Sequence, residues 1–307
     1  MDIVKLKAGD YTAEINVGRG ANCISLRNNR YRASILRTPQ DPAMPDNAYF
    51  YGMPVLYPVN RIENGSFSFE GRQYRFPINE PKTNCHIHGF LHDAPFVVTE
   101  QGERFVRCEY VSDARYHFFG HKFSVELLYT LSDQGLRQEV CIHNLSEENM
   151  PSFLGFHTTF NVPFVEDSAA DAVRVYAEVG DEIERNTTSY VPTGRILPND
   201  GISEALNDGS FAPAKDSISR HYKAAGDGRL ELLDVEKRLK VVYCVDERFG
   251  WRLLFNGGRQ DFICLEPQTC MVNCQNTDLD PAYTGFDFIA PHACKKYVSQ
   301  IYVQAML

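Results

Sequence analysis

The chain has 307 residues, of which 43% are hydrophobic, 23% charged and 12% aromatic. This composition supplies apolar side chains for a large core and differs from that of a disordered chain. The net charge of −9 and the lack of a Lys/Arg-rich run argue against nucleic acid and anionic membranes as partners, because both bind basic surfaces.

The sequence shows no apolar signal-peptide segment at its N-terminus and no run of 18 apolar residues, so we expect a cytoplasmic protein. Its nine cysteines are odd in number and mostly stand in apolar, strand-like segments, which favours buried free thiols in a reducing compartment. Cys264, Cys270 and Cys274 are close in sequence but lack the paired C-x-x-C spacing of a zinc site. We interpret these three cysteines as structural.

Short runs of β-branched and aromatic residues, bounded by turn residues, recur along the whole chain. Ser66–Phe76 is predicted to be a hairpin around Glu70-Gly71. Further strands are predicted at residues 104–111, 122–131, 135–144, 172–179, 238–245, 250–256, 261–266 and 295–303. Helical periodicity is limited to short turns near residues 165–172 and 202–208, and Asn199–Asp227 is expected to be a long loop.

These runs do not alternate with helices, as the strands of a parallel α/β sheet would. We therefore predict an all-β fold, a large β-sandwich of two antiparallel sheets packed face to face. The chain is expected to form one domain over residues 1–307, since sandwiches of this size occur as single units.

Two polar segments in the first third of the chain could carry chemistry. Asn60 and Arg61 precede the hairpin, and an arginine fork suits neighbouring hydroxyls or a carboxylate, although a solvated loop has the same composition. His86, His88 and His92 follow, and on a strand the first two would share a face and could bind one metal ion. Individually hydrogen-bonded histidines are the favoured interpretation, and the metal site is the alternative.

Two further segments place an ionisable group in apolar surroundings. His157 is the only ionisable residue of the run 151–164, where it is either a core histidine or a proton donor beside a carboxylate. Glu266 ends the apolar run 261–266 directly before a proline. Burying a carboxylate there is costly without a partner, and carboxylates in such places often act as general bases.

Taken in order, these segments resemble the aldose 1-epimerase (galactose mutarotase) family. The similar motifs are NRIENGSFSFEGRQYRF, the His-Gly of HIHGF, HTTFNV, VPTGRILP, LEPQTCMVNCQN and GANCISLR. They run from about residue 20 to residue 290. The sequence departs from the family at Phe90, where a second glycine is usual, and at Met271-Val272, where a Pro-Asp pair is usual.

The resemblance implies a β-sandwich enzyme that interconverts the α and β anomers of a free hexose such as galactose or glucose. It assigns Glu266 as the base toward the C1 hydroxyl, His157 as the acid toward the ring oxygen, and His88 as a hydrogen-bonding neighbour of both. Arg61, Asn60 and Gln268 are expected to bind sugar hydroxyls. No cofactor and no metal are expected, the expected partner is the sugar, and the oligomeric state is left open.

Three questions remain open at the level of sequence. The aspartate with which family members hold a sugar hydroxyl has no clear counterpart, and Asp234 and Asp246 are the candidates. The substrate could instead be a hexose 6-phosphate, or the chain could be a non-catalytic sugar-binding or sensing protein. A metalloenzyme using His86, His88 and His92 is the third alternative.

Overall fold

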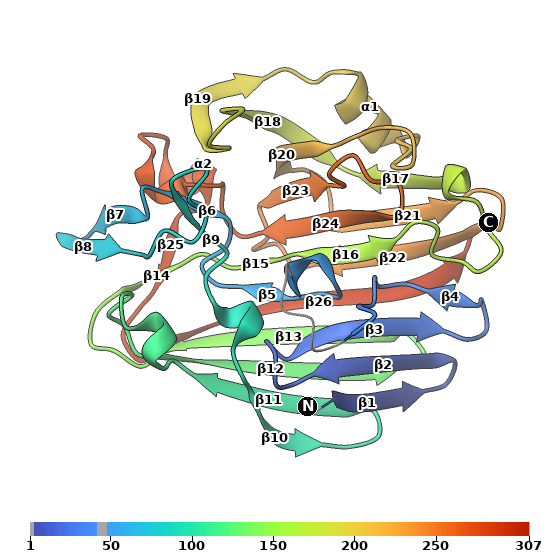
Figure 1. Ribbon diagram of the computed structural model, residues 1–307, viewed down its shortest axis with the longest axis horizontal. Helices are drawn as coiled ribbons and strands as arrows, with labels where there is room; N and C mark the ends of the chain where they lie inside the picture. The colour runs from blue at the N-terminus through green and yellow to red at the C-terminus, as the bar shows by residue number, and fades with distance from the viewer. Residues whose placement is uncertain (1–2, 42–47, 307) are drawn as a thin grey trace.

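The computed structural model describes residues 3–41 and 48–306, and antiparallel strands dominate it (Figure 1). One sheet has eight strands in the spatial order β10 (Val97–Gln101), β11 (Phe105–Val111), β12 (Phe123–Ser132), β13 (Gly135–Asn144), β26 (Cys294–Ala305), β22 (Leu239–Val245), β21 (Arg229–Asp234) and β17 (Val173–Ala177). This sheet is called the first sheet below. The C-terminal strand β26 lies in its middle, between β13 and β22.

A second eight-stranded sheet carries the site described below. Its order is β19 (Pro192–Leu197), β18 (Val179–Arg185), β20 (Ser219–Ala224), β23 (Trp251–Phe255), β24 (Phe262–Gln268), β15 (Gly155–Phe156) and β5 (Val55–Leu56), and β16 (Thr158–Asn161) also pairs with β24. Because β15 and β16 both pair with β24, the segment between them lies directly against that strand.

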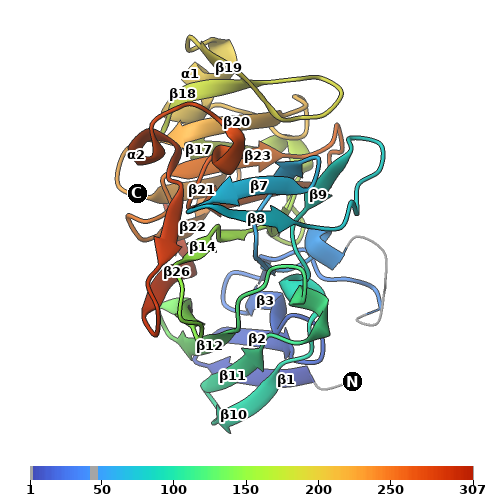
Figure 2. The same ribbon diagram turned by 90° about the vertical axis from the view of Figure 1, so that its left-hand side faces the viewer.

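Smaller elements surround the two large sheets. A four-stranded sheet comprises β1 (Ile3–Ala8), β2 (Tyr11–Asn16), β3 (Asn22–Asn28) and β4 (Ala33–Ser34). Two-stranded ribbons pair β6 (Arg61–Glu63) with β9 (Cys85–Ile87), β7 (Ser66–Phe69) with β8 (Arg72–Arg75), and β14 (Met150–Ser152) with β25 (Asp287–Ile289). The β6–β9 and β7–β8 ribbons lie together on the left-hand side of the molecule in Figure 1, the side that faces the viewer in Figure 2.

The described helices are short. They are α1 (Gly201–Asp208), α2 (Pro281–Thr284) and the 3-10 turns η1 (Ala48–Phe50), η2 (Leu91–Asp93), η3 (Ala114–Tyr116), η4 (Ala170–Ala172) and η5 (Cys274–Asn276). Within residues 3–41 and 48–306, no helix is both long and apolar enough to cross a membrane.

The two large sheets pack through apolar and aromatic side chains. Phe160 of β16 lies against Tyr243 of β22, with ring centroids 5.7 Å apart, and Thr158 shares a 3.0 Å hydrogen bond with the Tyr243 hydroxyl. Fully burying one such ring contributes about 1.5–3 kcal/mol to folding. The register places Ile263 opposite Phe160 and Leu265 opposite Thr158, so these β24 residues face the core. The alternate residues Cys264, Glu266 and Gln268 therefore face the other way.

The predicted all-β sandwich is confirmed, and each predicted strand has a counterpart. The hairpin turns at Glu70-Gly71, the short turn near 165–172 contains η4, and the turn near 202–208 is α1. The prediction of a long loop at Asn199–Asp227 was wrong, because this segment contains both α1 and β20. Asp200 caps α1 through hydrogen bonds from the backbone of Ile202 and Ser203, a local signal that composition alone did not reveal.

All nine cysteines are free thiols in the structure. Six of them are buried, whereas Cys141 and Cys244 are partly exposed and Cys294 is exposed. The expectation of buried thiols therefore fails for these three, which lie on β13, β22 and β26 of the first sheet.

Candidate functional site

A cavity of about 310 Å³ lies over the outward face of the second sheet. It is lined by strand residues of that sheet and by loops that cover them: Tyr49, Phe50, Asn60, Arg61, Glu80, Ile87, His88, His157, Arg185, Tyr190, Ser219, Leu253, Phe255 and Glu266. The volume lies at the lower end of the range for small-molecule sites, about 300–1,000 Å³. Five of the six predicted site residues therefore meet at one cavity, although they are spread over more than 200 positions of sequence.

The strand register brings His157 and Glu266 together. Gly155 pairs with Gln268 and Thr158 with Leu265, and this antiparallel register places His157 opposite Glu266. The imidazole Nε2 lies 3.3 Å from the carboxylate Oε1, and both side chains are at least 95% buried. Their proximity thus follows from regular sheet pairing.

Burial sets the protonation of this pair. It raises the pKa of Glu266 to about 8, against smaller lowering effects of the Arg185 charge, the Gln268 hydrogen bond and the Arg61 charge. Burial also lowers the pKa of His157 to about 3. At pH values between these two pKa values the pair holds one titratable proton. It therefore offers one proton donor and one proton acceptor and carries no net charge.

A chain of amides supports Glu266 from behind. The Gln268 amide Nε2 donates to Glu266 Oε2 at 3.3 Å, and Asn60 Nδ2 donates to Gln268 Oε1 at 3.1 Å. Asn60 Oδ1 in turn accepts the Arg61 backbone N–H at 2.9 Å. Gln268 is fully buried and does not line the cavity, so its placement differs from the predicted contact with sugar. It holds the carboxylate in place instead.

His88 reaches the cavity from a left-handed backbone position, with φ +63°. Its Nδ1 accepts the Asn60 backbone N–H at 3.3 Å, which leaves the proton of the neutral ring on Nε2. Burial, with the nearby His157 and Arg61, lowers the pKa of His88 well below its ordinary value. Gly89 follows at φ +58°, where an added Cβ would lie 1.9 Å from the Tyr57 carbonyl oxygen, so this position requires glycine.

Two arginines line the cavity and differ in their partners, because Arg61 is paired with a carboxylate and Arg185 with neutral groups. Arg61 is held by Glu80 through two hydrogen bonds of 2.6 and 2.7 Å, and its guanidinium carbon lies 4.9 Å from the Tyr190 ring centroid. Arg185 donates to the Ser219 carbonyl and, at 3.2 Å, to its hydroxyl. Within the described part of the chain, no carboxylate lies at ion-pair distance from Arg185. Burial and the Arg61 charge lower the pKa of Arg185 to about 10.

Aromatic rings form much of the remaining wall. Tyr49 lies 5.3 Å from His157 and 5.2 Å from His88 between ring centroids, and Phe50 packs edge-on against His157 at 5.3 Å. Phe50 also stacks on Phe255 at 5.8 Å. Such a wall excludes water and can cover an apolar C–H face, while the polar groups of the floor remain free to bind oxygen atoms.

Neither aspartate candidate lies at the cavity. Asp234 is on β21 of the first sheet, where it accepts the Lys237 backbone N–H at 2.8 Å. Asp246 follows β22 and accepts the backbone N–H groups of Val298 and Arg248 at 2.6 and 2.9 Å. Among the described lining residues there is no aspartate, and the acidic groups are Glu80 and Glu266.

The alternative of a metal group made of His86, His88 and His92 has no counterpart among the described residues. His86 Nδ1 lies 2.7 Å from the Pro77 carbonyl oxygen, and the left-handed backbone of His88 interrupts the strand alternation on which this alternative relied. Among the described residues, metal-compatible groups occur elsewhere. One is His157, Cys264 and Glu266, whose donor atoms all lie within 4.8 Å of one another. Cys264, however, is fully buried beneath the cavity lining, where its thiol contacts the Thr159 hydroxyl oxygen at 3.4 Å.

Sequence reasoning missed nine of the fourteen lining residues, among them Tyr49, Glu80, Arg185 and Tyr190. Arg185 belongs to the strand VGDEIER, whose charged composition is typical of a solvent-exposed edge strand. Tyr49 and Tyr190 lie outside regular strands. No local sequence signal separates these residues from ordinary surface groups.

Comparison with known proteins identifies the family to which this chain belongs. The aldose 1-epimerase family matches residues 2–282, so the chain belongs to the aldose 1-epimerase family. YihR, an uncharacterized protein of Escherichia coli (strain K12), is 27% identical over 291 residues, which cover 90% of this chain and 87% of YihR. LacX of Lactococcus lactis subsp. lactis is 24% identical and covers 72% of this chain and 75% of its own length.

Solved structures agree with this assignment. A galactose mutarotase-like protein from Clostridium acetobutylicum superposes with a TM-score of 0.93 at 30% identity, covering 99% of this chain and 95% of its own. A GalM/aldose epimerase homologue from C. elegans superposes with a TM-score of 0.79 at 15% identity, covering 100% and 99%. The latter similarity concerns the fold alone.

Proposed function

We propose that this chain is an aldose 1-epimerase that interconverts the α and β anomers of a free hexose such as galactose or glucose. The observation that carries the proposal is the buried His157–Glu266 pair, 3.3 Å apart on a cavity that admits a small molecule. Membership of the aldose 1-epimerase family supports the reaction class.

Mutarotation requires a donor and an acceptor at the same hemiacetal. The C1 hydroxyl loses its proton while the ring oxygen gains one, the C1–O5 bond opens to the aldehyde, rotation about C1–C2 exposes the other carbonyl face, and the steps reverse. In the proposed assignment Glu266 accepts the C1 proton and His157 donates to the ring oxygen. Positioned acid–base groups of this kind typically contribute about 10²–10⁴-fold.

This assignment requires the titratable proton of the pair to be on His157, so that Glu266 is a carboxylate and His157 an imidazolium. In the empty cavity burial favours neutral Glu266 and neutral His157, and transfer of the proton across the 3.3 Å gap gives the carboxylate and imidazolium with the same proton count. Arg185, the Gln268 amide and Arg61 all favour the carboxylate. The Nε2–H group of His88 would stabilise negative charge that develops on the sugar oxygen.

The remaining predicted residues take revised roles. Arg61 has part of its fork occupied by Glu80 and would bind a hydroxyl with its remaining donors. The Asn60 side chain is engaged by Gln268 and the Arg61 backbone, so Asn60 supports the rim as well as lining it. Gln268 acts through Glu266 as a positioning residue.

Optical rotation tests the proposal directly. Crystalline α-D-galactose or α-D-glucose is dissolved in buffer with and without protein, and relaxation to the equilibrium rotation is followed. The wild type should accelerate relaxation without changing the final rotation, and Glu266→Gln should lose about 10²–10⁴-fold, or about 3–5 kcal/mol of barrier lowering. Glu109→Gln, at an exposed glutamate of β11, is the matched control. Near-normal turnover of Glu266→Gln would refute the assignment.

Arg185 favours a second candidate substrate, a hexose 6-phosphate. A half-buried guanidinium without a carboxylate partner in the described chain would be well matched by an anionic substituent at the cavity rim. Competition between sugar phosphate and free sugar decides between the two. A higher kcat/KM for the phosphate that falls to the value for the free sugar in Arg185→Gln would favour this candidate. Saturable binding of either sugar without any acceleration would indicate a sugar-binding protein.

A further inference from the structure

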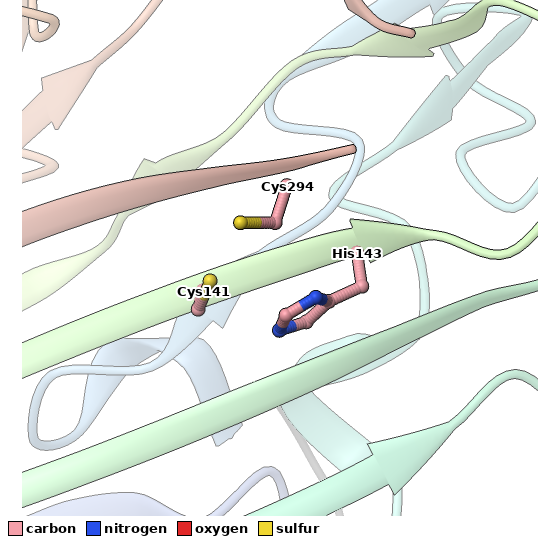
Figure 3. A group of neighbouring side chains, drawn as sticks. All are labelled: Cys141, His143 and Cys294. Carbon is pink, nitrogen blue, oxygen red and sulfur yellow. The ribbon is translucent and has the colours of Figure 1, made fainter. Parts of the chain in front are cut away.

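A group of three metal-compatible side chains lies on the first sheet and shares no residue with the cavity. Cys141 and His143 are on β13, and Cys294 is the first residue of β26 (Figure 3). Their donor atoms all lie within 4.8 Å of one another. The neighbouring residues Val140, Ile142 and Asn144 are buried, so Cys141 and His143 share the outward face of the strand.

The strand register explains why these three residues meet. His143 pairs directly with Cys294, and Cys141 pairs with Lys296, two positions further along β26. Cys294 is therefore the direct cross-strand neighbour of His143 and the diagonal neighbour of Cys141, both within reach of side chains on a sheet face.

Two thiols and an imidazole form a donor set suited to a thiophilic cation. Zinc binds sulfur at about 2.3 Å and imidazole nitrogen at about 2.0–2.1 Å in tetrahedral sites, so its ligand atoms lie roughly 3.5–3.8 Å apart. Donor atoms within 4.8 Å reach this geometry by small rotations of surface side chains. Cys294 is exposed, which gives an ion a path of entry and leaves a fourth position for water.

The surrounding charges do not oppose a cation. Glu126 of β12 pairs with Cys141 across the strands and is itself bound by Arg107 at 2.5 Å. Lys296 forms an ion pair with Glu139. The nearest cations are thus neutralised by carboxylates, and two thiolates would offset the charge of a divalent ion.

We propose that Cys141, His143 and Cys294 form a three-ligand binding site for a thiophilic divalent cation such as Zn²⁺, with its fourth position open to solvent. The ion would cross-link the end of β13 to the start of β26, the C-terminal strand in the middle of the first sheet. This site is independent of the sugar chemistry, since it uses none of the cavity residues.

The test is a Zn²⁺ titration of the reduced, chelator-treated full-length protein against a colorimetric zinc chelator. One ion should bind per chain, and Cys141→Ser, Cys294→Ser and Cys294→Ala should each weaken binding by more than about 100-fold, because removing a ligand exceeds the 10–100-fold typical of its supporting residues. His143→Gln should also weaken it. Cys244→Ser is the matched control, since Cys244 is the other accessible thiol of the first sheet and belongs to neither three-donor group.

Cobalt distinguishes this site from the buried group at the cavity. Co²⁺ should give an intense thiolate-to-metal absorption that Cys294→Ser abolishes and Cys264→Ser leaves unchanged, with rotation kinetics unaffected by the ion. The proposal is overturned if the wild type binds no Zn²⁺, if Cys294→Ser and Cys294→Ala both retain wild-type affinity, or if Cys264→Ser alone removes binding. Oxidation that joins Cys141 to Cys294 should abolish binding, and unchanged affinity in that state would equally overturn it.

Discussion

The floor and the rim of the cavity are built in different ways. The floor is regular sheet, in which β24 and the β15–β16 segment place Glu266 opposite His157 by register alone. The rim is made of turns and short segments, including left-handed residues at Asn60 and His88. His157 and Glu266 can be separated only by a change of strand register, which would also displace the buried residues of the same strands. The positions of the rim residues depend instead on local backbone geometry. The floor therefore fixes the chemistry, and the rim is the part that can vary with the substrate.

The sharpest test of the floor is whether its two members act as one unit. We expect Glu266→Gln and His157→Asn each to lower kcat by about 10²–10⁴-fold, because each removes one half of the proton exchange. The double variant should be about as slow as the slower single variant, since a pair that works in concert gives non-additive losses. Optical rotation at saturating sugar measures all three. Multiplicative losses in the double variant would show that the two residues act independently.

The rim should respond through binding. Arg185→Gln is expected to lower kcat/KM about 10–100-fold, mainly through KM, because a hydrogen bond from a charged donor is worth about 1.5–3 kcal/mol. Arg195→Gln, at an exposed arginine of β19 that pairs with Glu184 and does not line the cavity, should leave both constants unchanged. A loss confined to kcat would mean that Arg185 acts on the reacting atoms and belongs with the floor.

The pH dependence separates the floor from the rim without any mutation. Because burial raises the pKa of Glu266 to about 8, the pair keeps its proton below that value and loses it above, so kcat/KM should fall about tenfold per unit at higher pH. The lowered pKa of His157 places the acid limb well below the ordinary range of histidine. Initial rates in matched buffers, corrected for the uncatalysed reaction, give the profile. An alkaline limb near the ordinary pKa of a carboxyl group would contradict the burial argument.

The same shifts predict a pH dependence of stability. The raised pKa of Glu266 means that its neutral form contributes stability that is lost as pH rises through about 8. The lowered pKa of His157 has the opposite sign, and its contribution is lost as pH falls below the ordinary value of histidine. Thermal unfolding of Glu266→Gln should show a smaller decline than the wild type between mildly acidic pH, where the carboxyl of the unfolded chain ionises, and about pH 8. An identical decline in both proteins would show that Glu266 does not ionise there.

The residues of the cavity floor could be predicted from the sequence more readily than those of the rim. His157 and Glu266 were recognisable because an ionisable group within an apolar run is conspicuous, and the strands that carry them have clear β patterns. Arg185 was not, because its approach to the cavity depends on the pairing of β18 with β20, where the register shifts between Val179 and Glu182. Gln268 was found, but its contacts with Glu266 and Asn60 were not, since sequence does not show which atoms an amide will meet once folded.

The smallest expected effect tests the support behind the floor. Gln268→Met keeps a similar volume but removes the amide that donates to Glu266 and accepts from Asn60. Because that hydrogen bond favours the carboxylate, its loss should move the alkaline limb of kcat/KM upward and lower kcat several-fold, while KM changes little. Gln268→Glu would place a second carboxyl beside Glu266 and should move the limb further in the same direction, since like charges disfavour ionisation. A rise in KM with an unmoved limb would instead mean that Gln268 touches the sugar, as the sequence first suggested.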